Sequence, residues 1–103
     1  MVKELDEQTF DDFVNGSDLV MIDCWAPWCR PCRMLSPVIE ELAAELEGKV
    51  SIAKLNTDEN QSIAIRFGIN AIPTMLIFKN GVQQRSLIGL MQKEDIRAHL
   101  LKL

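Results

Sequence analysis

The apolar run LVMIDCW, residues 19–25, constrains the fold more than any other feature of the sequence. It has the length of a strand and only Asp23 interrupts it. Such a strand is typical of the centre of a sheet that is covered on both faces. Residues 29–48 then place apolar side chains at helical spacing opposite several glutamates, and residues 49–55 (KVSIAKL) form a second buried strand. Strand, amphipathic helix and strand predict a parallel pair joined by a crossover helix.

Three further helices are predicted from the same kind of spacing. The first begins at Asp6, a residue suited to an N-cap, and ends near residue 16. A short helix is predicted over residues 60–68, and a last helix over residues 92–103. The apolar positions of these segments recur every three or four residues, so each predicted helix has one face for a core.

Residues 74–89 (TMLIFKNGVQQRSLIG) predict a hairpin at the end of the sheet. The two strand-like halves meet at Asn80-Gly81, a pair that readily adopts the positive φ angles of a tight turn. After the opening helix the predicted order is therefore β-α-β-α-β-β-α. This order predicts an α/β fold with a mixed sheet and helices on both faces.

Composition limits the domain organisation and the partners. A chain of 103 residues that is 48% hydrophobic fits a single domain, 1–103, with one core. The net charge of −4 and the scattered Lys and Arg argue against nucleic acid as a partner. No apolar run reaches the length of about 18 residues needed to span a membrane, and acidic residues stand where a signal peptide is basic and apolar. We therefore expect a cytoplasmic protein with no membrane association.

Three cysteines are too few for a disulfide-stapled fold, so their arrangement favours chemistry. Cys29 and Cys32 stand three apart at a strand-to-helix turn, close enough for a disulfide, and the N-terminus of a helix stabilises a thiolate. Pro31 suits the first helical turn, which needs no backbone N–H. The alternative is a zinc site, but only Cys24 and His99 could complete its four ligands, and they lie in separate segments.

The sequence resembles the thioredoxin family along almost its whole length. The matching segments are WAPWCRPCRMLSP at the cysteines, Asp23 in the preceding strand, AKLNTDEN after the second strand, IPT at 72–74, FKNG at 78–81, and Gly89. The resemblance implies a thioredoxin fold with a central mixed five-stranded sheet flanked by helices on both faces. It also implies a monomer without cofactor or metal.

The resemblance assigns roles to four residues near the cysteine pair. Cys29 would be the exposed nucleophile that attacks a target disulfide, and Cys32 the buried residue that resolves the mixed disulfide. Asp23 would shuttle the proton, because burial raises the pKa of a carboxyl group into a useful range. Lys54, a cation in an apolar strand, would modulate Asp23. Without the resemblance, the preferred interpretation of Asp23 is a structural residue that caps a nearby backbone group. Lys54 could then be a solvated lysine at a strand edge.

The resemblance also implies an apolar rim on which an extended target segment docks. Its members would be Trp28, Ile72, Pro73, Gly89 and Leu90, and the bond before Pro73 would be cis. Trp28 could instead be a packing residue only, and Ile72 and Leu90 could be incidental exposed side chains. Leu90 and Met91 are larger than the residues common in the family at these positions, which predicts an altered target preference.

Two departures from the family concern residues beside the cysteines. Arg30 replaces a residue that is usually Gly, and a cation next to Cys29 favours its thiolate and so the reduced form. Arg30 could alternatively serve only solubility or contact an acidic partner. Cys24 replaces a frequent aromatic residue, and we interpret it as a small buried side chain.

The function predicted is that of a thiol-disulfide oxidoreductase. It would reduce disulfides of target proteins through Cys29 and Cys32 and be re-reduced by a thioredoxin reductase. Two alternatives remain at this point: a glutaredoxin-like or more oxidising exchange protein, favoured by Arg30, and a non-redox interaction module of the same fold. Metal analysis would test the zinc site.

Overall fold

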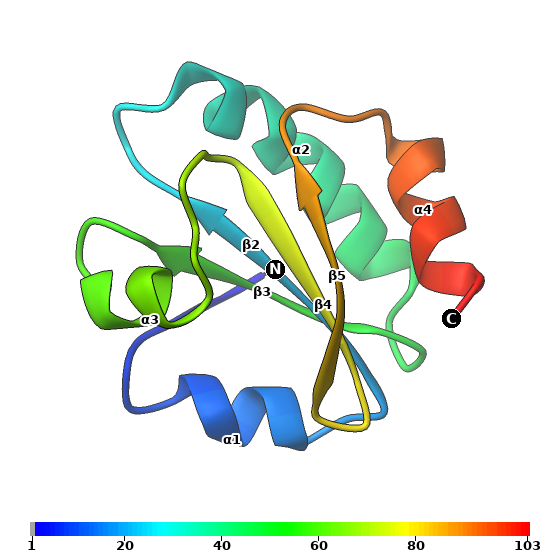
Figure 1. Cartoon of the computed structure of the whole chain (residues 1–103). Helices are drawn as coiled ribbons and strands as arrows, with labels where there is room; N and C mark the ends of the chain where they lie inside the picture. Colours follow the sequence, from blue (N-terminus) through cyan, green and yellow to red (C-terminus); the bar gives the residue numbers. More distant parts are fainter. Residues whose placement is uncertain (1) are drawn as a thin grey trace.

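A mixed five-stranded sheet forms the centre of the structure, a computed structural model that describes residues 2–103 (Figure 1). Strand β3 runs parallel to β1 and β2, whereas β4 is antiparallel to β2 and β5. The sheet order is β1-β3-β2-β4-β5, so β2 lies at the centre, as its apolar sequence predicts. The strands are β1 (Lys3–Leu5), β2 (Leu19–Trp25), β3 (Ser51–Asn56), β4 (Thr74–Lys79) and β5 (Val82–Ile88).

Four helices cover the two faces of this sheet. Figure 1 shows α2 and α4 on one face and α1 and α3 on the other. The fold is the predicted α/β arrangement, with the expected crossover from β2 through α2 to β3. The helices are α1 (Phe10–Asn15), α2 (Arg30–Glu45), α3 (Gln61–Arg66) and α4 (Lys93–Leu101).

The chain begins differently from the prediction made from its residues alone. Residues 3–5 form strand β1, which no apolar pattern indicated because only Leu5 of the three is buried. The first helix begins at Phe10 rather than after Asp6. The carboxylate of Asp6 instead accepts hydrogen bonds from the backbone N–H groups of Gln8 and Thr9, so it stabilises a turn that precedes the helix.

Two apolar layers hold the sheet between its helices. The layer under α2 and α4 includes Met21, Leu35 and Ile96, all fully buried. The opposite layer contains three phenylalanine rings from α1, the segment after α3 and β4, with centroids 5.3 to 6.1 Å apart. Such edge-to-face and tilted ring pairs stabilise beyond the area that they bury. The packed layers fix β2 and the start of α2 relative to each other.

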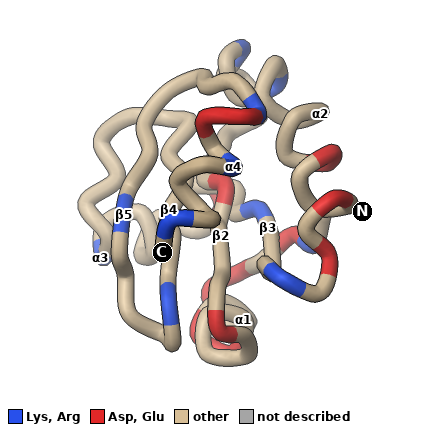
Figure 2. Tube along the Cα trace, turned by 90° about the vertical axis from the view of Figure 1, so that its right-hand side faces the viewer, with Lys and Arg blue, Asp and Glu red and all other residues tan. Residues whose placement is uncertain are grey.

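Acidic and basic residues are spread over the elements. In Figure 2, Lys and Arg occur on several strands and helices among Asp and Glu, and α1 carries acidic residues. Within residues 2–103, no helix is long and apolar enough to cross a membrane.

The backbone geometry of the hairpin turn between β4 and β5 leads to a testable prediction about the stability of the chain. Asn80 and Gly81 have φ angles of 52° and 80°, and a Cβ on Gly81 would lie 2.5 Å from the side-chain oxygen of Asn15. Gly81→Ala is therefore expected to lower the free energy of unfolding by about 1–2 kcal/mol, because an L side chain is strained at this φ. Asn80→Gly is the control and should stay within about 0.5 kcal/mol of the native chain in urea unfolding. Equal midpoints for both variants would contradict the prediction.

Candidate functional site

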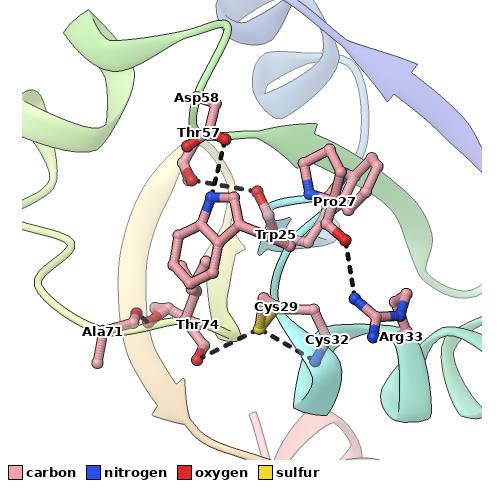
Figure 3. The surroundings of a disulfide bond; sticks show 11 residues. Trp25, Pro27, Cys29, Cys32, Arg33, Thr57, Asp58, Ala71 and Thr74 are labelled. Carbon is pink, nitrogen blue, oxygen red and sulfur yellow. Dashed lines mark hydrogen bonds between the residues drawn. A yellow bond between two sulfur atoms is a disulfide. The ribbon is translucent and has the colours of Figure 1, made fainter.

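Cys29 and Cys32 form a disulfide at the start of α2, directly after the carboxyl end of β2 (Figure 3). Their Cα atoms are 5.3 Å apart, as expected for residues one helical turn apart. Cys29 is the N-cap of the helix, and Pro31 lies in the first turn. The sequence folds this way locally because Pro31 needs no hydrogen-bond acceptor there and the backbone of Cys29 is extended.

The helix N-terminus acts directly on the sulfur of Cys29. The backbone N–H of Cys32 points at Cys29 Sγ, with an N···S distance of 3.2 Å. A thiolate at this atom would receive that hydrogen bond and the positive end of the helix dipole. The side chains of Cys29 and Cys32 are 4% and 2% exposed. The expected contrast between an exposed and a buried cysteine is thus wrong for the disulfide form, in which both pack against Ala26 and Ile72.

Trp28 stands beside the disulfide with a largely exposed ring. The residue is 68% exposed, and its indole N–H donates a hydrogen bond of 2.9 Å to the carboxylate of Asp58. Thr57 holds the same loop from its other end, since both its N–H and its hydroxyl donate to the carbonyl oxygen of Trp25 (Figure 3). The structure thus adds Asp58 and Thr57 to the residues that the sequence indicated. No local pattern could identify them, because each contact spans about thirty residues.

The segment 72–74 lies against the other side of the disulfide. The bond between Ile72 and Pro73 is cis, as the resemblance implied, and the carbonyl oxygen of Ile72 is 3.8 Å from Cys29 Sγ. The N–H of Gly89, whose φ is +93°, donates a 2.8 Å hydrogen bond to the carbonyl oxygen of Pro73. Leu90 follows and is 47% exposed. Trp28, Ile72, Pro73, Gly89 and Leu90 therefore come from three separate segments of the chain.

Asp23 is fully buried in β2, and neither carboxylate oxygen has a hydrogen-bond partner within the described chain. Burial is the main reason that its pKa rises from 3.8 to about 7, and the charge of Glu4 raises it further, while Lys54 opposes the rise. Lys54 is the neighbour of Asp23 in strand register. Its ammonium group, however, donates to the hydroxyl of Ser36 at 3.3 Å and lies 4.7 Å from the centre of the Trp25 ring.

Two arginines lie close to the cysteine pair, Arg30 between the two cysteines and Arg33 directly after Cys32. Arg30 is exposed, and its side chain has no hydrogen-bond or ion-pair partner within residues 2–103. Arg33, which the sequence analysis did not single out, donates a 2.8 Å hydrogen bond to the carbonyl oxygen of Pro27 and so braces the loop before Cys29. The sequence does not indicate this contact, because a backbone carbonyl can accept a hydrogen bond whatever the residue type.

Cys24 lies in the apolar layer under α1 and α3, and it is fully buried. Burial raises the pKa of its thiol, with a further contribution from the charge of Asp23. This environment fits a small buried side chain. Within residues 2–103, no group of three or more His, Cys, Asp and Glu side chains is placed to hold a metal ion.

Comparison with known proteins identifies the family. The family model for Thioredoxin matches residues 1–102. A thioredoxin of Rickettsia bellii is 46% identical over 97 residues, which cover 93% of this chain and 92% of the relative.

The chain belongs to the thioredoxin family.

Other relatives come from plastids and archaea. Thioredoxin M5 of rice chloroplasts is 51% identical over 88% of this chain, which spans 54% of that longer protein. The solved structure of a mutant thioredoxin from Halobacterium salinarum superposes with a TM-score of 0.90 at 34% identity, covering 97% of this chain and 88% of that one. The fold is the thioredoxin fold. Members of this family are thiol-disulfide oxidoreductases, and the chain is a protein-disulfide reductase with disulfide-containing targets and a reductase-type partner.

Proposed function

We propose that Cys29 and Cys32 carry the reductase activity as a dithiol-disulfide couple. The thiolate of Cys29 attacks one sulfur of a target disulfide, and the other target sulfur leaves as a thiolate. Cys32 then attacks Cys29 Sγ, which releases the reduced target and leaves the Cys29–Cys32 disulfide. Two electrons have passed from this chain to the target. The observation that supports this assignment best is the hydrogen bond from the N–H of Cys32 to Cys29 Sγ at the helix N-terminus.

Asp23 serves the second step as a proton acceptor. Cys32 must lose its proton before it can attack, and a base with a pKa near 7 is well matched to that task at neutral pH. Within the described chain, the carboxylate of Asp23 is free of hydrogen bonds that would hold it ionised. Lys54, its neighbour in register, modulates this proton affinity by its charge.

The target docks on the rim formed by Trp28, Ile72, Pro73, Gly89 and Leu90. Trp28 and Leu90 are the members that expose the most apolar surface, and such a patch beside a reactive group fits an extended segment of a partner protein. The size of Leu90, and of Met91 after it, selects among targets.

We also propose a domain organisation, an oligomeric state and a cellular compartment for this chain. The chain is a single thioredoxin domain, 1–103, that acts as a monomer in the cytoplasm without cofactor or nucleic acid, and a thioredoxin reductase re-reduces it. Both apolar layers draw on elements from the two halves of the chain, which supports one domain. Relatives occur in bacteria and in chloroplasts, so fractionation of cells that produce the native protein tests the compartment.

A redox titration tests the direction of electron flow. The Cys29–Cys32 couple is equilibrated with thiol–disulfide buffers, and fluorescence of Trp25 and Trp28 reports its state. A potential of about −270 mV, a value typical of thioredoxins in general, supports a general reductant. A potential of about −200 mV or above supports the second candidate, a glutaredoxin-like or more oxidising exchange protein. The exposed guanidinium of Arg30, next to Cys29, is the observation that favours it.

Arg30→Gly is expected to make the couple more reducing by up to about 30 mV. Arg30 stabilises the Cys29 thiolate, and a pKa change of one unit corresponds to about 1.4 kcal/mol or about 30 mV for two electrons. Solvent and salt reduce the effect of an exposed charge, so the change should shrink as ionic strength rises. Arg30→Lys is the control and should keep most of the native potential. Unchanged Cys29 pKa and potential in Arg30→Gly would show that Arg30 has no such role.

A further inference from the structure

Three charged residues form a row across the sheet next to the disulfide. Glu4 on β1 pairs in register with Lys54 on β3, and Lys54 pairs in register with Asp23 on β2. Neighbouring strands are about 4.8 Å apart, so the backbone positions of Glu4 and Asp23 are separated by roughly 10 Å. The resemblance to thioredoxins indicated Asp23 and Lys54 as site residues, but not Glu4.

The side chains of this row lie on the same face of the sheet. Residues two positions apart on a strand share a face. Met21 and Ile52, which precede Asp23 and Lys54 by two positions, both pack in the layer under α2 and α4. Val2, two positions before Glu4, packs against that same layer. Exposure increases along the row, since Asp23 is buried, Lys54 is half-buried and Glu4 is exposed.

Direct contacts connect Glu4 to Lys54 through an indole ring. Glu4 Oε2 accepts a 3.1 Å hydrogen bond from the indole N–H of Trp25. The ammonium group of Lys54 lies 4.7 Å from the centre of that ring and donates to Ser36 on α2. The indole, fixed at its edge by Glu4, thus holds the ammonium group by a cation–π contact. Lys54 makes no ion pair with Asp23 within the described residues.

We propose that Glu4 is a positioning residue for the proton step at Asp23. By holding Trp25, it keeps the ammonium group of Lys54 over the ring and away from the buried carboxylate. By its own charge, it opposes the loss of the Asp23 proton. A direct ion pair between Lys54 and Asp23 would hold the carboxylate ionised and remove its capacity to accept a proton at neutral pH. This inference rests on the role proposed above for Asp23.

Within residues 2–103, the remaining residues that surround Asp23 are uncharged, so the charges that act on its carboxyl group are those of Lys54 and Glu4. Strand β4 presents the uncharged Met75 opposite Asp23, and Cys24 faces the other apolar layer. On helix α2, the uncharged Ser36 accepts the hydrogen bond from Lys54. The charges of Lys54 and Glu4 act on the pKa of Asp23 in opposite directions, since Lys54 lowers it and Glu4 raises it.

Two variants of Glu4 separate the effect of its charge from the effect of its hydrogen bond with Trp25. Glu4→Gln removes the charge but retains an oxygen for the indole N–H, whereas Glu4→Leu removes both. The titration midpoint of the Asp23 carboxyl carbon is measured by NMR on the oxidised full chain. We expect Glu4→Gln to lower this midpoint by roughly 0.3–0.5 pH units, as a screened charge at about 10 Å would. Glu4→Leu should lower it further and shift the indole N–H resonance of Trp25.

Glu47→Gln is the matched control, because it removes the same charge at an exposed position beyond the end of α2. It should leave the midpoint unchanged. The proposal is wrong if the midpoint does not move, or rises, in both Glu4 variants. The NMR readout does not depend on activity, so failure of this coupling is distinguished from failure of the proposed function. The latter would appear as an unchanged pH profile of target reduction in Asp23→Asn.

Discussion

Replacing Cys29 by Ser is expected to abolish the reduction of protein disulfides, with a loss of roughly 10³-fold or more. The hydroxyl of Ser is not ionised at neutral pH, and oxygen does not form the mixed disulfide on which exchange depends. Loss of a covalent nucleophile removes the whole reaction path, so the residual rate should be that of uncatalysed exchange. The measurement is the rate at which the reduced chain reduces a disulfide-containing protein.

Cys32→Ser is expected to give a different defect from Cys29→Ser. Its Cys29 can still attack, but nothing resolves the product, so the target stays covalently attached to this chain. Non-reducing electrophoresis and mass spectrometry detect that complex. Cys24→Ala is the matched control, because it removes the third thiol from the opposite apolar layer. Added to Cys32→Ser, it should not prevent formation of the covalent complex with the target. In the otherwise native chain, it should not lower the activity.

The same variants decide between redox chemistry and a non-redox interaction module. A module would retain its effect on a partner after both Cys29 and Cys32 were replaced by Ser, because its apolar rim would be intact. A redox protein would lose the effect completely. Attachment of targets through Cys32 in the Cys29→Ser variant would contradict the proposed order of attack.

Asp23→Asn is expected to raise stability relative to the native chain by an amount that grows with pH. The pKa of Asp23 is about 7 in the folded chain and ordinarily 3.8, so the folded state binds the proton more tightly. Stability of the native chain therefore falls as pH rises from about 4 to about 7 and levels off above that window. A rise in pKa from 3.8 to about 7 corresponds to about 4 kcal/mol. Asp23 is fully buried, so solvent screening reduces this value little.

Urea unfolding of the oxidised native and variant chains at several pH values measures this difference. The titration of all other groups cancels between the two chains. At pH 4 the difference should be small, because Asp23 is then protonated in the folded chain and, like Asn, carries no buried charge. Asp12→Asn, at an exposed position in α1, is the control for loss of one carboxylate without the burial of Asp23. A constant difference between Asp23→Asn and the native chain would show that Asp23 does not titrate near pH 7.

The order of the elements was predictable because it depends on local patterns. Strand β2 has the bounds of its apolar run, and the turn at Asn80-Gly81 has the positive φ angles that this pair indicates. Strand β1 was not predicted from residue patterns, because a three-residue strand with one buried side chain carries no periodicity. Its place depends on pairing with β3, which lies some fifty residues further along the chain.

The candidate site was predictable in part. The spacing of Cys29 and Cys32 indicated a disulfide at a helix start, and the resemblance to thioredoxins supplied Asp23 and the cis bond before Pro73. A cis bond is uncommon before proline, so the residues alone did not indicate it. The burial of Cys29 in the disulfide form differed from the expectation, because surface exposure depends on the segment at Ile72 that packs over it.

By itself, the sequence determined the helices and the strands other than β1, their order, the central position of β2 and the cysteine pair at a helix N-terminus. These features follow from side-chain periodicity, turn chemistry and spacing, which act between near neighbours. Tertiary structure alone decided which residues surround that pair. The contacts of Asp58 with Trp28 and of Glu4 with Trp25 join residues 30 and 21 positions apart. The proton affinity of Asp23 likewise depends on its burial and on the charges of Lys54 on β3 and Glu4 on β1. No local pattern encodes how close these residues lie to Asp23.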